Sequence, residues 1–157
     1  MKLLKKYPFT LLCTIVIWYL SFFTPPPTKL DDVVGIDKLV HTAMYGGWCF
    51  LFWWEHLRTR YRRNNGTLNY LPVQWGKAFW YALFAPSAMG GLIEILQENC
   101  TNHRRSGDWW DFGANTLGVV LMYFIARIIE RNLVLRYLKP MYRWLNLKPR
   151  QSAGQAR

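Results

Sequence analysis

Three short runs of the sequence hold ionisable side chains at helical spacing. Asp37, His41 and Tyr45 follow one another at intervals of four residues, and Glu94 precedes Gln97 by three. A helix would place the members of each run on one face. Because a histidine and a carboxylate in a shared site can take up and return a proton, His41 and Glu94 are candidates for general acid and general base.

The third run combines charged groups with an amide. Asp111, Asn115 and Gly118 share a helical face, and the doubled pair Arg104 and Arg105 precedes them. Arginine suits phosphate or carboxylate, which it binds through two parallel hydrogen bonds. Asp111 is the third catalytic candidate, beside the histidine and the glutamate. The predicted ligand-binding set is Asp37, Lys38, His41, Tyr45, Glu94, Gln97, Arg105, Asp108, Asp111 and Asn115.

Simpler roles exist for each of these residues. Asp37, Lys38 and Asp108 stand near predicted helix ends, where interfacial and capping residues are common. His41 could be a hydrogen-bonded packing residue, and Asn115 could join two helices. The convergence of three polar faces at the same depth favours one shared polar pocket over these separate roles.

Neither a metal ion nor a cofactor is predicted. His41, Glu94 and Asp111 are the set that a metal would use, but one histidine among scattered carboxylates is a weak ligand pattern. The three cysteines are scattered and form no C-x-x-C pair, which argues against a zinc site and a disulfide framework. We interpret them as small core residues.

Four apolar stretches are expected to position the polar runs. They cover about residues 7–24, 39–55, 78–97 and 111–129, and charged segments separate them. Hydrophobic residues make up 52% of the chain and aromatic residues 17%, although the mean hydropathy is only −0.04. Lipid excludes charge, loops collect it, and a span needs about 20 apolar residues. The sequence therefore predicts an all-α, four-transmembrane-helix bundle.

The distribution of Lys and Arg orients this bundle. Three precede the first span, five lie in the loop after the second, and seven lie in the tail from Arg131, whereas the other two links hold two each. Positive residues collect on the cytoplasmic side, so both termini are placed in the cytoplasm and the polar runs face outward. We expect a multi-pass inner-membrane protein with a domain over 1–136 and a basic aromatic tail over 137–157.

Local features refine the boundaries. The first run could be a cleavable signal peptide, but it ends without a small-x-small cleavage pattern, so a retained helix is favoured. Thr28–Lys38 and Asn99–Trp110 are interpreted as polar links, and Glu55–Lys77 as the longest loop. Ala114 and Gly118 form a small-xxx-small pair suited to close helix packing.

The polar runs resemble the VanZ-like family of bacterial membrane proteins. Order and spacing agree from about Asp37 to Gly118, whereas the doubled arginine departs from the pattern. The family is associated with resistance to glycopeptide antibiotics, notably teicoplanin, so the resemblance implies a cell-envelope setting. The matching pieces are Asp37-Lys38-Leu-Val-His41-Thr-Ala-Met-Tyr45-Gly46, Gly91-Leu-Ile-Glu94-Ile-Leu-Gln97, and Arg105 with Asp111-Phe-Gly-Ala-Asn115-Thr-Leu-Gly118.

Two functions lead the alternatives. The first is a protein that binds or modulates a lipid-linked or peptidoglycan-related ligand, with membrane lipids or lipid-linked cell-wall intermediates as partners. The second is a membrane hydrolase or transferase acting on a lipid headgroup or cell-wall precursor, with His41 and Glu94 as acid and base and Asp111 orienting the histidine. The sequence contains no H-E-x-x-H or G-x-S-x-G motif, which favours binding.

A small transporter or a structural partner is the third functional hypothesis. Four spans without an inverted repeat are few for a transporter, although an oligomer would remove that objection. Nucleic acid is not an expected partner, because the basic residues flank the apolar runs and form no recognisable binding motif.

Overall fold

The protein is all-α, as predicted. The computed structural model describes residues 2–23, 35–63, 77–100, 108–132, 136–137 and 140–141. Within these residues the helices are α1 (Lys2–Lys6), α2 (Pro8–Phe22), α3 (Ile36–Arg63), α4 (Lys77–Cys100) and α5 (Trp109–Asn132). The predicted basic aromatic tail over 137–157 lies almost wholly outside the described residues.

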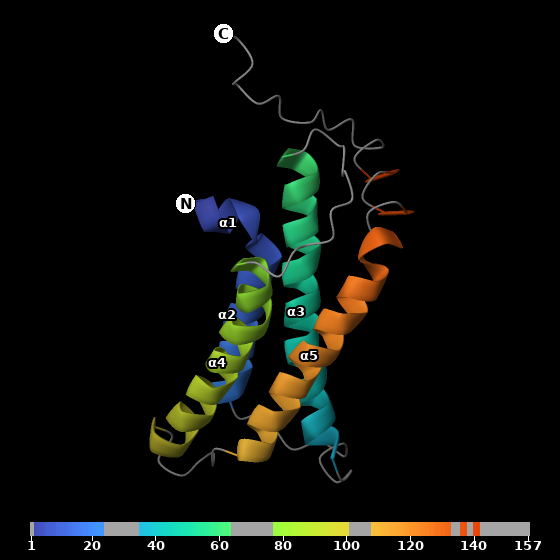
Figure 1. Ribbon diagram of the computed structural model, residues 1–157. Helices are drawn as coiled ribbons and strands as arrows, with labels where there is room; N and C mark the ends of the chain where they lie inside the picture. Colours follow the sequence, from blue (N-terminus) through green and yellow to red (C-terminus); the bar gives the residue numbers. More distant parts are fainter. Residues whose placement is uncertain are drawn as a thin grey trace.

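Successive helices from α2 to α5 alternate in direction. Figure 1 shows the start of α3, the end of α4 and the start of α5 at one end of the bundle, opposite α1. The most extensive packing is between α3 and α5, followed by that between α4 and α5. The ends of the three helices that carry the polar runs therefore lie at one end of the molecule.

One helix of the described part of the chain is long and apolar enough to span a membrane. It covers Trp109–Ile129 in α5, and 28% of its most apolar stretch is buried. The core helix of a soluble protein, in contrast, is mostly buried. The other strongly apolar helix, α2, has 15 residues, or about 22 Å, which is shorter than the ~30 Å hydrocarbon core of a bilayer.

The first apolar run forms one helix inside its predicted bounds of 7–24, and a separate short helix, α1, precedes it. Tyr7 separates α1 from α2 and has φ −133° and ψ 54°. Pro8 disfavours helical conformation in the preceding residue, and it begins a helix readily because its missing N–H needs no partner. The helix of this run covers Pro8–Phe22.

The second helix continues past its predicted end. The sequence predicts a loop from Glu55, but α3 extends to Arg63. Trp53 and Leu57, four residues apart, are both buried, so the buried face of α3 runs on for another turn. The prediction of a loop is wrong for this first part, and residues 64–76 lie outside the described residues.

The predicted polar links are also shorter than expected. α3 begins at Ile36, so Asp37 and Lys38 belong to its first turn. α4 extends to Cys100, and α5 begins at Trp109. The polar residues at these boundaries are therefore fixed on helices.

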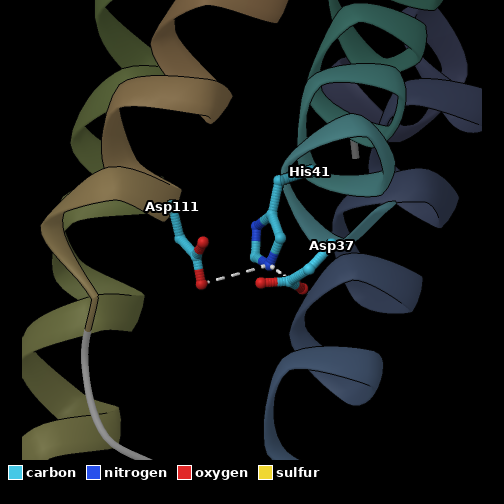
Figure 2. A group of neighbouring side chains, drawn as sticks. All are labelled: Asp37, His41 and Asp111. Atoms are coloured by element: carbon cyan, nitrogen blue, oxygen red, sulfur yellow. Dashed lines mark ion pairs between the residues drawn. The ribbon is translucent and has the colours of Figure 1, made fainter. Parts of the chain in front are cut away.

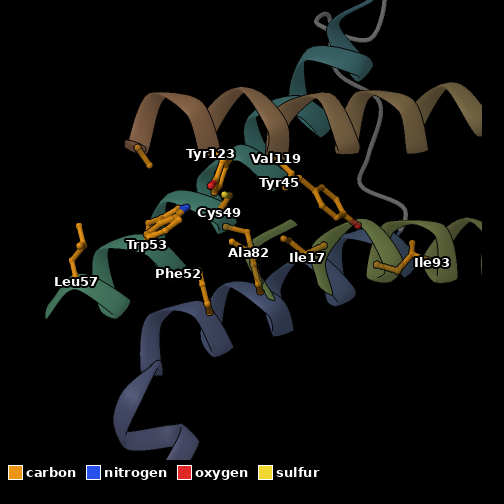
Figure 3. Close-up of a cluster of buried hydrophobic side chains, with 12 residues drawn as sticks. Ile17, Tyr45, Cys49, Phe52, Trp53, Leu57, Ala82, Ile93, Val119 and Tyr123 are labelled. Atoms are coloured by element: carbon orange, nitrogen blue, oxygen red, sulfur yellow. The ribbon is translucent and has the colours of Figure 1, made fainter. Parts of the chain in front are cut away.

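The core lies along one face of α3. Trp48 and Phe52 stack with ring centroids 5.7 Å apart, and Trp53 packs against Tyr123 of α5 at the same distance. Cys49, also on this face, is fully buried. Figure 3 shows how residues of the neighbouring helices complete the cluster around α3. The interpretation of the cysteines as core residues is wrong for Cys100, which is exposed.

A buried glutamate of α3 caps the start of α2. Glu55 is 0% exposed, and its carboxylate accepts hydrogen bonds from the backbone N–H groups of Phe9 and Thr10, both at 3.0 Å. The hydroxyl of Thr10 donates to it at 2.7 Å. The first N–H groups of a helix have no partner within the helix and favour negative charge, so Glu55 fixes α2 to α3.

Candidate functional site

Close contact between α3 and α5 brings two polar runs together. A Cβ atom added at Gly118 would stand 2.2 Å from the carbonyl oxygen of Thr42, and one added at Gly46 would stand 3.2 Å from that of Gly118. The hydroxyl of Thr42 donates to the carbonyl oxygen of Ala114 at 3.2 Å. The predicted close packing at Ala114 and Gly118 is confirmed, with α3 as the partner.

Lys38 joins the first turn of α3 to the start of α5. Its Nζ donates to Asp108 Oδ2 at 2.7 Å, to Asp37 Oδ2 at 3.2 Å and to Asp111 Oδ1. Asp108 also caps α5 by accepting a hydrogen bond from the backbone N–H of Trp110 at 2.8 Å. We call Lys38, Asp37, Asp108 and Asp111 the lysine cluster. One ammonium faces three carboxylates in it, which leaves two negative charges uncompensated within the cluster.

Two groups of the lysine cluster have shifted pKa values. Hydrogen bonds to Asp108 and Asp111 raise the pKa of Lys38 above its ordinary value. The hydrogen bond from Lys38, followed by that from the Trp110 N–H, lowers the pKa of Asp108. The hydrogen bonds thus favour the charged form of both partners.

His41 lies between two carboxylates, as Figure 2 shows. Its Nε2 is 3.6 Å from Asp37 Oδ1 and 3.5 Å from Asp111 Oδ2. Its Nδ1 is 3.0 Å from Asn115 Oδ1. The structure therefore pairs Asp37 with His41 at the helical interval seen in the sequence, and it adds the Asp111 and Asn115 face of α5.

Tyr45, Glu94 and Asn115 continue the polar region into the bundle, and all three are buried. A Cβ atom at Gly90 would stand 3.2 Å from Asn115 Nδ2 and 3.4 Å from the Tyr45 hydroxyl, so the missing side chain lets three helices meet here. Glu94, one turn further along α4, accepts a hydrogen bond from the backbone N–H of Asp108 at 3.0 Å through Oε2.

Two buried polar atoms of this region lack a hydrogen-bond partner among the described residues. They are Glu94 Oε1, an acceptor, and Asn115 Nδ2, a donor. The two residues are 3% and 1% exposed, so bulk water hardly reaches them. Leaving such a group unpaired costs about 1–3 kcal/mol. A ligand that offers both a donor and an acceptor would recover part of this free energy.

Gln97 and Arg105 are not placed with this group. Gln97 is buried, but its Nε2 donates to the carbonyl oxygen of Ser21 on α2 at 2.7 Å. Arg105 lies outside the described residues, as does Arg104. The positive charge that the structure places at the site comes from Lys38. From its sequence position alone, Lys38 is better explained as an interfacial or capping residue. Its partners Asp108 and Asp111 stand 70 and 73 residues away, so no local spacing identifies the contact.

No protein-family model, no curated protein and no solved structure matches this chain. The resemblance of the polar runs to the VanZ-like family therefore stays a prediction.

Proposed function

We propose that this chain is a multi-pass, VanZ-like protein of the bacterial inner membrane whose polar site binds a lipid-linked or peptidoglycan-related ligand. The observation that carries the proposal is the unpaired pair of buried atoms, Glu94 Oε1 and Asn115 Nδ2, beside the lysine cluster. Sugar hydroxyls and peptide amides offer donors and acceptors close together, so either group would pair with both atoms.

The lengths and surfaces of the helices support the proposed four spans. α3 and α4 have 28 and 24 residues, about 42 and 36 Å at 1.5 Å per residue, and so exceed the ~30 Å hydrocarbon core. α4 exposes Trp80, Phe84, Leu92 and Ile95. A large exposed apolar surface of this kind suits lipid. The charged residues that interrupt the apolar surfaces of α3 and α4 include those of the site.

The proposed orientation places the site outside the cytoplasm. Figure 1 places the site ends of α3, α4 and α5 together, opposite α1. Trp109 and Trp110, at the same end, are 69% and 80% exposed. Tryptophan favours the membrane interface, so these rings would lie at headgroup depth around the opening of the site. A ligand anchored in the outer leaflet would reach the site from there.

Retention of a labelled ligand tests the proposal. The full chain is purified in lipid nanodiscs, and the dissociation constant of a fluorescent polyprenyl-pyrophosphate disaccharide-peptide is measured. Glu94→Leu and Asn115→Leu each remove one of the unpaired atoms. We expect each to weaken binding about 10- to 100-fold, because a buried hydrogen bond of this kind contributes about 1–3 kcal/mol.

The matched control is Glu55→Gln, which alters another buried acidic residue at the opposite end of α3. It should leave ligand retention unchanged. Size-exclusion profiles of all variants separate loss of binding from loss of folding. Equal retention by the wild-type chain and both site variants would contradict the proposed binding site.

A membrane hydrolase or transferase is the second candidate. The position of His41 between two carboxylates favours it, because Asp111 could orient the imidazole for proton transfer while Glu94 acts as the second acid-base group. Mass spectrometry of the same probe after incubation distinguishes the candidates. If the wild-type chain cleaves the headgroup and His41→Gln does not, the enzyme is supported. A probe that is bound but intact supports the binding function.

A further inference from the structure

We propose that His41 Nε2, Asp37 Oδ1 and Asp111 Oδ2 form a binding site for a divalent transition-metal ion of the Zn²⁺ class. Figure 2 shows the three side chains converging from α3 and α5. One ligand atom from each residue lies within 4.8 Å of the others. A histidine nitrogen with carboxylate oxygens is a ligand set that Zn²⁺ accepts, and three protein ligands leave a fourth position open for water or another ligand.

The distances fit a shared cation better than hydrogen bonds. Nε2 stands 3.5 and 3.6 Å from the two oxygens, beyond the usual N–H···O range of 2.7–3.2 Å. Bonds of about 2.1 Å from Zn²⁺ to nitrogen and oxygen, at tetrahedral angles, place two ligand atoms about 3.4 Å apart. Both separations from Nε2 therefore match those between two ligand atoms of a Zn²⁺ ion.

The partner of the other ring nitrogen orients His41 for this role. Nδ1 lies 3.0 Å from Asn115 Oδ1, and an amide oxygen only accepts hydrogen bonds. Nδ1 thus carries the proton, and in the neutral ring the lone pair of Nε2 points at the two carboxylates. Metal-binding histidines commonly donate their second N–H in this way to a fixed acceptor. Asn115 is buried and so holds the ring in place.

Lys38 leaves the metal-facing oxygens free. Its ammonium binds Asp37 through Oδ2 and Asp111 through Oδ1, whereas the opposite oxygen of each carboxylate faces His41. With Asp108 included, the lysine cluster has two uncompensated negative charges. A divalent ion would neutralise them.

Two further observations support a ligand at this position. The unpaired acceptor Glu94 Oε1 belongs to a residue whose other oxygen binds the backbone N–H of Asp108, a member of the lysine cluster. The unpaired donor Asn115 Nδ2 belongs to the residue that holds His41. Both residues are more than nine-tenths buried. The Asp37 side chain, in contrast, is 62% exposed, which gives an ion access from solvent.

Cobalt provides the test, because tetrahedral Co²⁺ replaces Zn²⁺ and absorbs visible light strongly. The full chain, purified in detergent and treated with a chelator, is titrated with Co²⁺ alone, without lipid ligand. We expect saturable absorption bands at one ion per chain, which Zn²⁺ abolishes by displacement. Asp111→Asn and His41→Gln should weaken binding by more than about 100-fold, and Asn115→Leu by about 10- to 100-fold.

Two variants make the test selective. Asp37→Asn changes an exposed ligand, so it should weaken binding of the ion without a risk to folding. Lys38→Gln removes the competing ammonium and should tighten Co²⁺ binding by about 10-fold or more, whereas a merely structural role of Lys38 predicts no gain. No tetrahedral spectrum in the wild-type chain would overturn the proposal. Binding by Asp37→Asn and Asp111→Asn that equals that of the wild-type chain would overturn it too, because it would show an adventitious ion only.

Discussion

The contact between Gly118 and α3 makes any side chain at this position costly. A methyl group there would stand 2.2 Å from the carbonyl oxygen of Thr42, which is helical backbone and cannot rotate away. We expect Gly118→Ala to force α3 and α5 apart and to lower the free energy of unfolding by about 1–3 kcal/mol. Thermal unfolding of the purified chain in detergent, followed by circular dichroism, measures the loss.

Gly113→Ala is the control on the same helix. A Cβ atom at Gly113 meets nothing within 4 Å, and alanine has a higher helix propensity than glycine. The unfolding temperature of this variant should stay the same or rise. A similar decrease in both variants would contradict the special contact at Gly118.

Glu55 gives a second prediction for a single residue. Glu55→Ala leaves three donors of Phe9 and Thr10, two of them buried, without the acceptor that they have now. We expect the free energy of unfolding to fall by about 1.5–3 kcal/mol, the range for hydrogen bonds to a charged group. Glu55→Gln keeps one acceptor oxygen and should lose less. Equal losses in the two variants would rule out hydrogen-bond acceptance as the main contribution.

Helical spacing predicts only part of the site at this scale. The interval of four residues places Asp37 beside His41, and the structure has them at that position. The contacts of Lys38 with Asp108 and Asp111, and those of Glu55 with the start of α2, join residues 45 to 73 positions apart. Spacing within one helix carries no information about them, because they depend on which helix faces pack together.

At the scale of helices, the ion pair of Lys38 with Asp108 links α3 to α5 and makes their packing pH-dependent. The pKa of Asp108 is lowered, so its contribution is complete above the ordinary value of 3.8 and is lost as the pH falls through the lowered value. The pKa of Lys38 is raised, so its contribution is complete below the ordinary value of 10.5 and is lost as the pH rises through the raised value. Unfolding temperatures should therefore form a plateau at neutral pH and fall in acid.

Asp108→Asn tests the acid side of this profile. Asparagine still caps a helix, but it has no charge to lose. The fall in unfolding temperature at low pH should be shallower in this variant than in the wild-type chain. If the unfolding temperature of the variant falls in acid as steeply as that of the wild-type chain, the ion pair of Lys38 with Asp108 is not the cause of the fall.

Sequence pattern predicts the helices better than their ends. Apolar runs locate all the long helices that the structure describes, but the first of these helices begins at Pro8 and not at Tyr7, because a proline disfavours helical conformation in the residue before it. The end of α3 is missed for a different reason. The charged residues from Glu55 onward suggest a loop. The Glu55 carboxylate, however, is buried and hydrogen-bonded to the start of α2, and Leu57 continues the buried face of α3.

For the whole molecule, the natural cysteines test the proposed orientation. Cys100 ends α4 beside the site and is exposed, whereas Cys49 is buried and Cys13 is partly covered. A membrane-impermeant maleimide should label Cys100 in right-side-out spheroplasts without permeabilisation. Mass spectrometry of the purified chain locates the label.

Cys100→Ser is the control for that measurement and should abolish the labelling. Labelling that requires permeabilisation would place the end of the bundle that holds the site in the cytoplasm. The sequence provides the expectation through its distribution of Lys and Arg.

The bond from Glu55 to α2 also imposes an order on biogenesis. The donors of Phe9 and Thr10 are synthesised before their acceptor, which follows Thr10 by 45 residues. At 5–20 residues per second, the ribosome needs roughly 2–9 s to add them. During that interval, the start of α2 must find hydrogen-bond partners in water or lipid headgroups. Helix α2 therefore reaches its final depth and anchorage only after most of α3 has been synthesised.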